Sequence, residues 1–164
     1  MKKHKHILVL LVENETGVLN RITSLMRRRR FNIESISAGH TAKKGLTRIT
    51  IVVNTEKVDV EQVMKQLYKI VPVIEIEDVT DENIFAAEVV IAKVKADAKK
   101  RGDVQQIADL FKAKIIHVEK DMIMMMVAGE TEKVSSFLDM VKPFGIIEMV
   151  RTGMTAMNKD KTLI

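Results

Sequence analysis

The strongest constraint on this fold is that one succession of sequence patterns occurs twice along the chain. In each half, short apolar runs typical of strands alternate with stretches of helical spacing, in the order strand, helix, strand, strand, helix, strand. The tetrapeptide Thr-Glu-Lys-Val occurs at 55–58 and at 131–134, each time where the second helix of the half is expected to begin. The two prolines, Pro72 and Pro143, follow those helices, and proline ends helical hydrogen bonding. The sequence therefore predicts two copies of one βαββαβ unit.

The predicted elements follow from the spacing of apolar residues. Strands are expected at residues 7–12, 32–41, 46–53, 73–79, 85–94, 114–119, 122–128 and 144–150. Helices are expected at residues 18–26, 60–71, 103–111 and 134–141. Asp103 and Gln106 have the spacing of a capping box, which places the start of the third helix beside them.

This order of elements indicates an α+β protein made of two tandem ferredoxin-like βαββαβ sandwiches, with helices on one face of each sheet. We predict domains at residues 1–80 and 81–164. The other face of such a sheet is polar where it meets water. Because the runs 7–12 and 122–127 are apolar at every position, we expect a partner chain to cover the open face. The methionines of 122–127 suit either a core or homodimer contact or an adaptable partner-binding surface.

Composition bounds the class of protein. Of the 164 residues, 46% are hydrophobic, which is enough for a packed core. There is no cysteine, which excludes disulfides, thiolate metal ligands and a cysteine nucleophile. The apolar run 7–12 is shorter than the roughly 7–15 residues of a signal-peptide core and the ~20 of a membrane helix. We therefore expect a cytoplasmic protein that does not enter a membrane.

The polar segment after the first strand is the best candidate binding site. Asn14, Glu15, Thr16 and Gly17 connect a strand to a helix, and the free amides at a helix start attract anions such as a carboxylate. A glycine lets a ligand approach the backbone, and asparagine offers both a donor and an acceptor. The alternative is an ordinary turn, in which asparagine and glycine serve only as turn formers.

A second feature, a run of basic residues, has a simple structural explanation. The basic run Arg27–Arg30 lies at a helix end, where cations suit the helix dipole; the alternative is nucleic-acid binding. Modules of βαββαβ order that bind RNA stack bases on aromatic residues of the central strands, and the strands 7–12 and 46–53 contain none. We predict no nucleic-acid partner.

The sequence predicts neither a metal site nor a catalytic centre. His4 and His6 alternate on one strand face and have the spacing to share a metal, but no third ligand is positioned by the sequence. His40 and His117 are isolated. No nucleophile elbow, phosphate-binding loop or dinucleotide fingerprint occurs, so we expect a protein without catalytic residues.

Residues 10–21, Leu-Leu-Val-Glu-Asn-Glu-Thr-Gly-Val-Leu-Asn-Arg, resemble the opening of an ACT domain. More narrowly, they resemble the small subunit of acetolactate synthase (acetohydroxyacid synthase). Further similar segments lie in order at 31–35, 46–51, 61–69, 111–118 and 148–153, so the resemblance covers nearly the whole chain. One departure is Arg30, which stands where many relatives have a glycine suited to a left-handed helix end.

The resemblance implies a non-catalytic regulatory subunit that activates a catalytic subunit and confers feedback inhibition by valine or another branched-chain amino acid. It implies ACT domains paired side by side in a homodimer or larger assembly, with the effector at their interface. Thiamine diphosphate, Mg²⁺ and FAD would then be held by the catalytic subunit, and this chain would hold no cofactor. The alternative is an ACT-type amino-acid sensor that regulates a different enzyme or transcription.

The effector site implied by the resemblance includes Asn14 and Gly17 from one chain and Asn32 from the facing chain. With the turn and its apolar surroundings added, the predicted site residues are Asn14, Glu15, Thr16, Gly17, Val18, Asn32 and Ile33. Val18, Leu19 and Ile33 would line a slot for an apolar side chain.

Overall fold

The computed structural model describes residues 4–55 and 57–162; the side chains of residues 4, 55 and 57–59 lie outside that description. The chain divides into two compact units, one of residues up to Phe85 together with those from Gly153 onward, the other of Ala86–Thr152. The predicted boundary after residue 80 lies near this division. The segment from Gly153 onward, however, packs with the first unit rather than with the second half of the chain.

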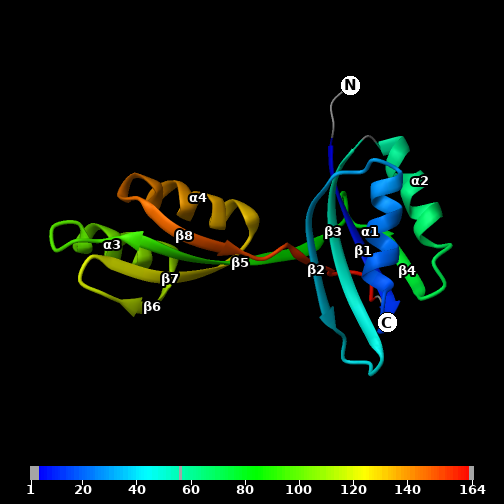
Figure 1. The fold of residues 1–164 in the computed structure, drawn as a ribbon, viewed down its shortest axis with the longest axis horizontal. Helices are drawn as coiled ribbons and strands as arrows, with labels where there is room; N and C mark the ends of the chain where they lie inside the picture. Colours follow the sequence, from blue (N-terminus) through cyan, green and yellow to red (C-terminus); the bar gives the residue numbers. More distant parts are fainter. Residues whose placement is uncertain (1–3, 56, 163–164) are drawn as a thin grey trace. The chain divides into compact units, whose positions relative to one another are not determined.

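The first unit has the predicted βαββαβ order (Figure 1). Its elements are β1 (His4–Glu13), α1 (Val18–Arg28), β2 (Ile33–His40), β3 (Leu46–Thr55), α2 (Lys57–Leu67) and β4 (Val73–Asp78). The strands form one sheet in the order β2-β3-β1-β4, with every neighbouring pair antiparallel. This is the ferredoxin-like arrangement expected from the sequence.

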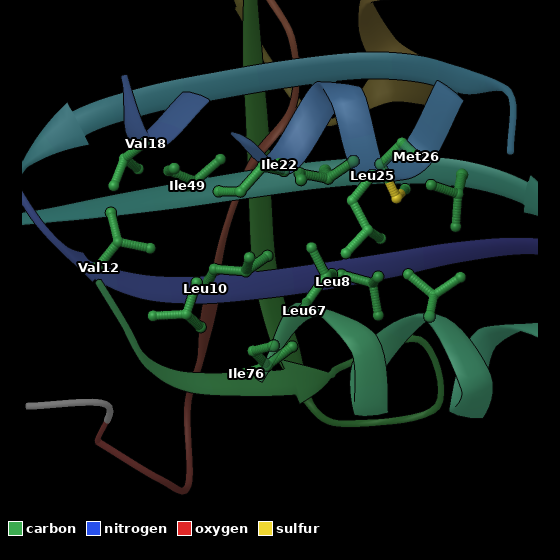
Figure 2. Packing of buried hydrophobic residues seen from close by; sticks show 14 of the residues in the cluster. Leu8, Leu10, Val12, Val18, Ile22, Leu25, Met26, Ile49, Leu67 and Ile76 are labelled. Carbon is green, nitrogen blue, oxygen red and sulfur yellow. The ribbon is translucent and has the colours of Figure 1, made fainter. Parts of the chain in front are cut away.

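The core of the first unit lies between this sheet and its two helices. Figure 2 shows Leu8, Leu10 and Val12 on one face of β1, where side chains two residues apart point the same way. They meet Ile22 and Met26 from α1, all of them fully buried. Ile49 of β3, Leu67 of α2 and Ile76 of β4 complete this layer (Figure 2). The apolar faces predicted from the helical and strand spacing thus pack together into one core.

The second unit repeats the order. Its elements are β5 (Ile84–Lys95), which begins in the first unit, α3 (Arg101–Phe111), β6 (Lys114–Val118), β7 (Met122–Gly129), α4 (Thr131–Val141), the short 3-10 helix η1 (Lys142–Phe144) and β8 (Ile146–Arg151). The strand order β6-β7-β5-β8 is that of the first sheet, again antiparallel. Phe111 and Phe137 pack edge to face in its core, with ring centroids 5.7 Å apart.

Several predicted helix and strand boundaries are wrong, and two of them involve the prolines or the residues before them. The helix expected to reach Val71 ends at Leu67, and residues 68–72 form a turn. The strand expected from residue 144 begins at Ile146, because η1 carries Pro143 at its start. The capping box is also wrong, because α3 begins two residues before Asp103.

The turn before α3 is held by a different aspartate. The side chain of Asp97 accepts the backbone N–H groups of Lys99 and Lys100, both at 3.0 Å. An Asx-type turn of this kind lets the helix begin earlier than the Asp103 spacing predicts. Asp103 instead lies in the first turn, where its charge suits the helix dipole.

A ninth strand, which was not predicted from the sequence, covers the open face of the first sheet. β9 (Thr155–Asn158) pairs with the start of β5 and lies against β1 and β3. Val9 and Leu11 point away from the helices, yet they are only 1% and 2% exposed. The expectation that a partner chain covers this face is therefore wrong for the first unit, because the chain's own C-terminal segment covers it.

The methionine run of β7 is divided between two faces. Met125 is fully buried under the helices with its neighbours Ile123 and Val127, whereas Met124 and Met126 are partly exposed on the opposite face. Alternation along a strand accounts for this division. One face of the run therefore belongs to the core, which was one of the two predicted roles. The other face points away from the helices.

Within residues 4–55 and 57–162, no helix is both long enough and apolar enough to cross a lipid bilayer.

Candidate functional site

The turn between β1 and α1 is tied to both neighbours of β1. The backbone N–H of Glu13 donates to the carbonyl of Pro72 at 2.8 Å. The N–H of Asn14 donates to the carbonyl of Gly45, also at 2.8 Å, so the hairpin between β2 and β3 supports the turn. Glu15 then folds back, its N–H donating to the Glu13 carbonyl at 2.9 Å. The backbone of the turn is thus fixed while its side chains face solvent.

The start of α1 presents backbone donors. Gly17 precedes the helix in a left-handed conformation, with φ 87°, and no side chain caps the helix. The N–H of Val18 makes a long hydrogen bond of 3.4 Å to the Glu15 carbonyl. The next amides, of Leu19 and Asn20, belong to the first turn of the helix, where an N–H has no acceptor within the helix. Together with the helix dipole, these groups form a surface suited to an anion such as a carboxylate.

The structure brings five of the predicted site residues together at this turn. Asn14, Glu15 and Thr16 have exposed side chains, and no hydrogen bond of the Asn14 side chain exists within the part of the chain that is described. Val18 differs from the prediction in its role, because its side chain packs into the core and only its N–H faces the turn. Leu19, which is 45% exposed, is the apolar side chain that this end of α1 offers to a ligand.

Asn32 and Ile33 lie at the other end of the same sheet. The carbonyl of Asn32 accepts the N–H of Asn54 near the end of β3, whereas Leu46 at the start of β3 pairs with Glu13 beside the Asn14 turn. Asn54 lies eight residue steps along β3 from Leu46, which corresponds to about 26 Å at ~3.3 Å per residue. Within one chain, Asn14 and Asn32 therefore cannot contact the same amino acid.

The exit from α1 sets the position of Asn32. Arg30 has φ 58°, and the N–H groups of Arg30 and Phe31 donate to the carbonyls of Arg27 and Met26, both at 3.0 Å. This is the Schellman pattern, which normally ends on glycine. The arginine at this position therefore leaves the left-handed exit intact, and β2 begins directly after Asn32.

Strand β2 leads from Asn32 along the edge of the sheet. A register shift between Ile33 and Ser35 places both Ile33 and Ile36 on the face that the helices cover. Ile33 is partly buried against the core, and Ile36 is 37% exposed. As the last strand of its sheet, β2 has an edge whose backbone groups are able to pair with another strand.

His6, one of the two histidines with metal-ligand spacing, is buried and bound to a protein partner. Its Nδ1 lies 3.0 Å from Oδ2 of Asp78, and Asp78 is bonded in turn by Thr80. The side chain of His4 lies outside the described residues. Across the described residues, no group of three or more His, Cys, Asp or Glu is arranged to hold a metal ion. The described contacts of the His6 ring are thus with Asp78 and Thr80.

The ferredoxin-like βαββαβ fold and the comparisons with known proteins identify the first unit as a domain of the ACT type. Residues 8–75 match the family model "AHAS small subunit-like ACT domain", and residues 87–160 match the model "Small subunit of acetolactate synthase". The chain belongs to the family of acetolactate synthase small subunits, the regulatory subunits of that enzyme.

Individual relatives cover almost the entire chain. The probable acetolactate synthase small subunit of Archaeoglobus fulgidus is 41% identical over 153 residues, which are 93% of this chain and 96% of the relative. The small subunit from Bacillus subtilis is 42% identical over 153 residues, 93% of this chain and 89% of the relative. The crystal structure of the small subunit from Thermotoga maritima superposes with a TM-score of 0.88 at 32% identity, covering 97% of this chain and 99% of that one.

Proposed function

We propose that this chain is the non-catalytic regulatory subunit of an acetolactate synthase, and that it activates a separate catalytic subunit and makes it sensitive to valine or another branched-chain amino acid. Family membership supports the role of a regulatory subunit, and the names of the relatives imply a larger partner subunit. The catalytic subunit would hold thiamine diphosphate, Mg²⁺ and FAD. Neither a nucleic acid nor a membrane is part of this proposal, and the chain would act in the cytoplasm.

The observation that carries the effector proposal is the placement of Asn14 and Asn32 at opposite ends of one sheet. A homodimer is most simply two-fold symmetric, and two β2 edges that meet about such an axis run antiparallel. Antiparallel pairing brings the Asn14 end of one copy toward the Asn32 end of the other. Two equivalent sites would then form, each with residues from both copies.

Each such site would contact the carboxylate, the other polar atoms of the head group and the side chain of an amino acid. The carboxylate would accept hydrogen bonds from the amides that follow Gly17. Asn14 of one copy and Asn32 of the other would bind the remaining polar atoms of the head group. Leu19 and Ile33, which are partly exposed, would contact the apolar side chain. A branched aliphatic side chain suits these two neighbours better than a charged one.

The decisive experiment is reconstitution with a cognate catalytic subunit. We expect the chain alone to form no acetolactate from pyruvate, to raise the rate of the catalytic subunit when added, and to make that rate fall as valine is titrated. Sedimentation equilibrium should show a dimer or larger species. Binding of valine without any effect on acetolactate synthase would favour the alternative, a sensor for a different enzyme or for transcription. A purely monomeric chain would contradict the shared site.

A further inference from the structure

A groove runs between α1 and α2 on the helix layer of the first unit. The two helices lie against each other over the same sheet (Figure 1). Three neighbouring hollows, of about 500, 360 and 350 Å³, lie along residues 20–31. The first two share Leu25 and Arg28, and the last two share Arg29 and Gln66, so they form one continuous groove. Residues 20–28 alone rise about 12 Å along α1, which is longer than a small inorganic anion.

The lining of this groove is basic. Six arginine and lysine side chains line the three hollows, and each of them is exposed: Arg21, Arg27, Arg28, Arg29, Lys65 and Lys69. None of these six cations forms an ion pair with another described residue. The helix dipole accounts for the cations in the last turn of each helix. It does not account for Arg21, which lies near the start of α1, where the dipole disfavours a cation.

The described acidic side chains of the first unit do not neutralise this groove. α1 contains no aspartate or glutamate, and none of the described residues that line the groove is acidic. Glu61 of α2 lies outside the lining and forms no ion pair with a described residue. On β4, Asp78 is bonded to His6, while Glu75 and Glu77 lie on the face away from the helices. The described part of the groove therefore has a positive potential that favours an anionic partner.

The groove also has an apolar floor. Leu25, Ile70 and Val71 line its largest hollow, and Val71 is 89% exposed. Phe31 lines the hollow at the other end and packs against the core. A partner made only of phosphates or small ions would leave Val71 in contact with water. A protein segment with acidic and apolar side chains would contact both the cations and this floor, because protein interfaces combine a polar rim with an apolar centre.

We propose that this groove docks an acidic segment of the catalytic subunit, with aspartate or glutamate along its edges and aliphatic side chains toward Val71. The inference rests on the proposed function, because it assigns the surface through which the catalytic subunit is bound and activated. Arg21 and Arg28 of α1 would lie on one side of the segment, and Lys65 and Lys69 at the end of α2 on the other. An amphipathic helix of roughly two to three turns would span the groove.

The same helix connects this groove to the effector turn. α1 begins after Gly17, where its first amides face the proposed effector, and its later residues form one wall of the groove. The two sites have no side chain in common. Because a helix moves as a rigid element, a displacement of α1 when the effector binds would change the fit of the groove to the catalytic subunit. The effector would then control the catalytic subunit without touching it.

The test compares how charge-reversed variants bind a cognate catalytic subunit, measured by biolayer interferometry. Arg28→Glu with Lys69→Glu reverses two cations of the groove, and Lys43→Glu with Lys44→Glu makes the same charge change in the β2–β3 hairpin. At physiological salt we expect the groove variant to raise Kd by about 100-fold and the hairpin variant by less than about 3-fold. Activation of acetolactate formation should require correspondingly more of the groove variant.

A milder variant guards against misfolding. Arg28→Gln with Lys69→Gln removes the two charges without placing an anion at the end of α1, and it should raise Kd by about 10-fold. Circular dichroism should show the same helix content in all variants. Equal weakening by the groove and hairpin variants would show diffuse attraction to a basic protein. Unchanged binding by the folded groove variants would show that the catalytic subunit docks elsewhere. Either result overturns this inference alone.

Two further outcomes separate this inference from its alternatives. If the unmodified chain neither binds nor activates the catalytic subunit, the proposed function fails and this inference fails with it. A short DNA duplex serves as the nucleic-acid probe in the same assay. Tighter binding of the duplex than of the catalytic subunit, lost in the groove variant, would assign the groove to nucleic acid and would also overturn the inference.

Discussion

Arg30 and Lys112 hold the same left-handed backbone position in the two halves of the chain, with φ 58° and 52°. Each follows the first helix of its unit, and each precedes an N–H that donates back into the helix, from Phe31 to Met26 and from Ala113 to Ala108. A side chain in this conformation costs roughly 1–2 kcal/mol relative to right-handed backbone. The repeat therefore extends to a detail of helix termination that the hydrophobic pattern does not reveal.

The first prediction follows from this strain. Arg30→Gly should raise the free energy of unfolding by about 0.5–1 kcal/mol, because relief of the left-handed strain exceeds the extra freedom that glycine gives the unfolded chain. Arg29→Gly is the matched control, since Arg29 has φ −92° and gains nothing from glycine. It should lower the same free energy by about 0.5–1 kcal/mol. Urea unfolding of both variants measures the difference, and equal destabilisation by both would contradict the argument.

The second prediction concerns the C-terminal segment. A Cβ added at Gly153 would lie 2.6 Å from the carbonyl oxygen of Ile36, which is backbone and cannot move aside alone. Gly153→Ala should therefore destabilise the first unit by roughly 1–3 kcal/mol, as overpacking does. Gly102→Ala is the control, because a Cβ there meets nothing within 4 Å and glycine disfavours a helix. It should leave stability unchanged or raise it. Similar melting temperatures for both variants would show that this segment does not pack as described.

A third prediction uses the carboxylate before α3. The pKa of Asp97 lies below its ordinary value, chiefly because the backbone N–H of Lys100 donates to the ionised carboxylate, with help from the N–H of Lys99. Because folding lowers this pKa, the ionised carboxylate of Asp97 stabilises the folded protein. The stabilisation is complete at a pH above 3.8, the ordinary pKa that applies in the unfolded chain, and it disappears as the pH falls through the lower pKa of the folded state. Asp97→Ala should therefore lower the urea midpoint at pH 6, and the gap from the unmodified chain should narrow as the pH falls toward 3.

The control for Asp97 is Asp103, which the sequence had favoured as the capping residue. Asp103→Ala should lower the midpoint less, since Asp103 lies inside the first turn of α3 and α3 has no side-chain cap at its N-terminus. A larger loss at Asp103 than at Asp97 would restore the capping-box interpretation. A gap at Asp97 that stays constant with pH would show that its carboxylate is not the stabilising form.

The sequence was sufficient for the parts of the fold that depend on periodicity. The spacing from Val18 to Met26 identified the buried face of α1, and the alternation of Ile49, Ile51 and Val53 identified the buried face of β3. Both patterns are long and repeat several times. β9 has only four residues, of which Ala156 and Asn158 are buried, and so short an alternation does not distinguish a strand from a loop.

The candidate site could be predicted only in part for a related reason. Residues adjacent in sequence, such as Asn14 and Gly17, necessarily share a turn. The distance between Asn14 and Asn32 depends instead on the register of β1 and β3, which side-chain patterns do not fix to the residue. The burial of Val18 depends on how α1 lies on the sheet, and the structure alone shows that only its N–H faces the turn.

A fourth prediction tests the effector residues one at a time. Asn14→Ala and Asn32→Ala should each raise the valine concentration for half-inhibition of the reconstituted enzyme by about 10-fold or more, since a hydrogen bond to a charged group contributes roughly 1.5–3 kcal/mol. Activation of the catalytic subunit should remain, because we expect it to depend on a surface other than the effector turn. Asn83→Ala, an exposed asparagine outside the proposed site, is the control and should inhibit normally. An unchanged inhibition curve for both site variants would locate the effector elsewhere.

The last prediction follows from the separation of Asn14 and Asn32 and distinguishes a shared site from two independent ones. In a mixed dimer of an Asn14→Ala chain and an Asn32→Ala chain, one interface site keeps both asparagines and the other loses both. If each site draws on both copies, dimers formed by mixing the two variants should recover valine binding at about half the sites, with nearly normal affinity. Isothermal titration calorimetry, after differently tagged chains are co-purified, measures this stoichiometry directly. If both asparagines served a site within one chain, every site in the mixed dimer would carry one substitution, and no high-affinity binding would return.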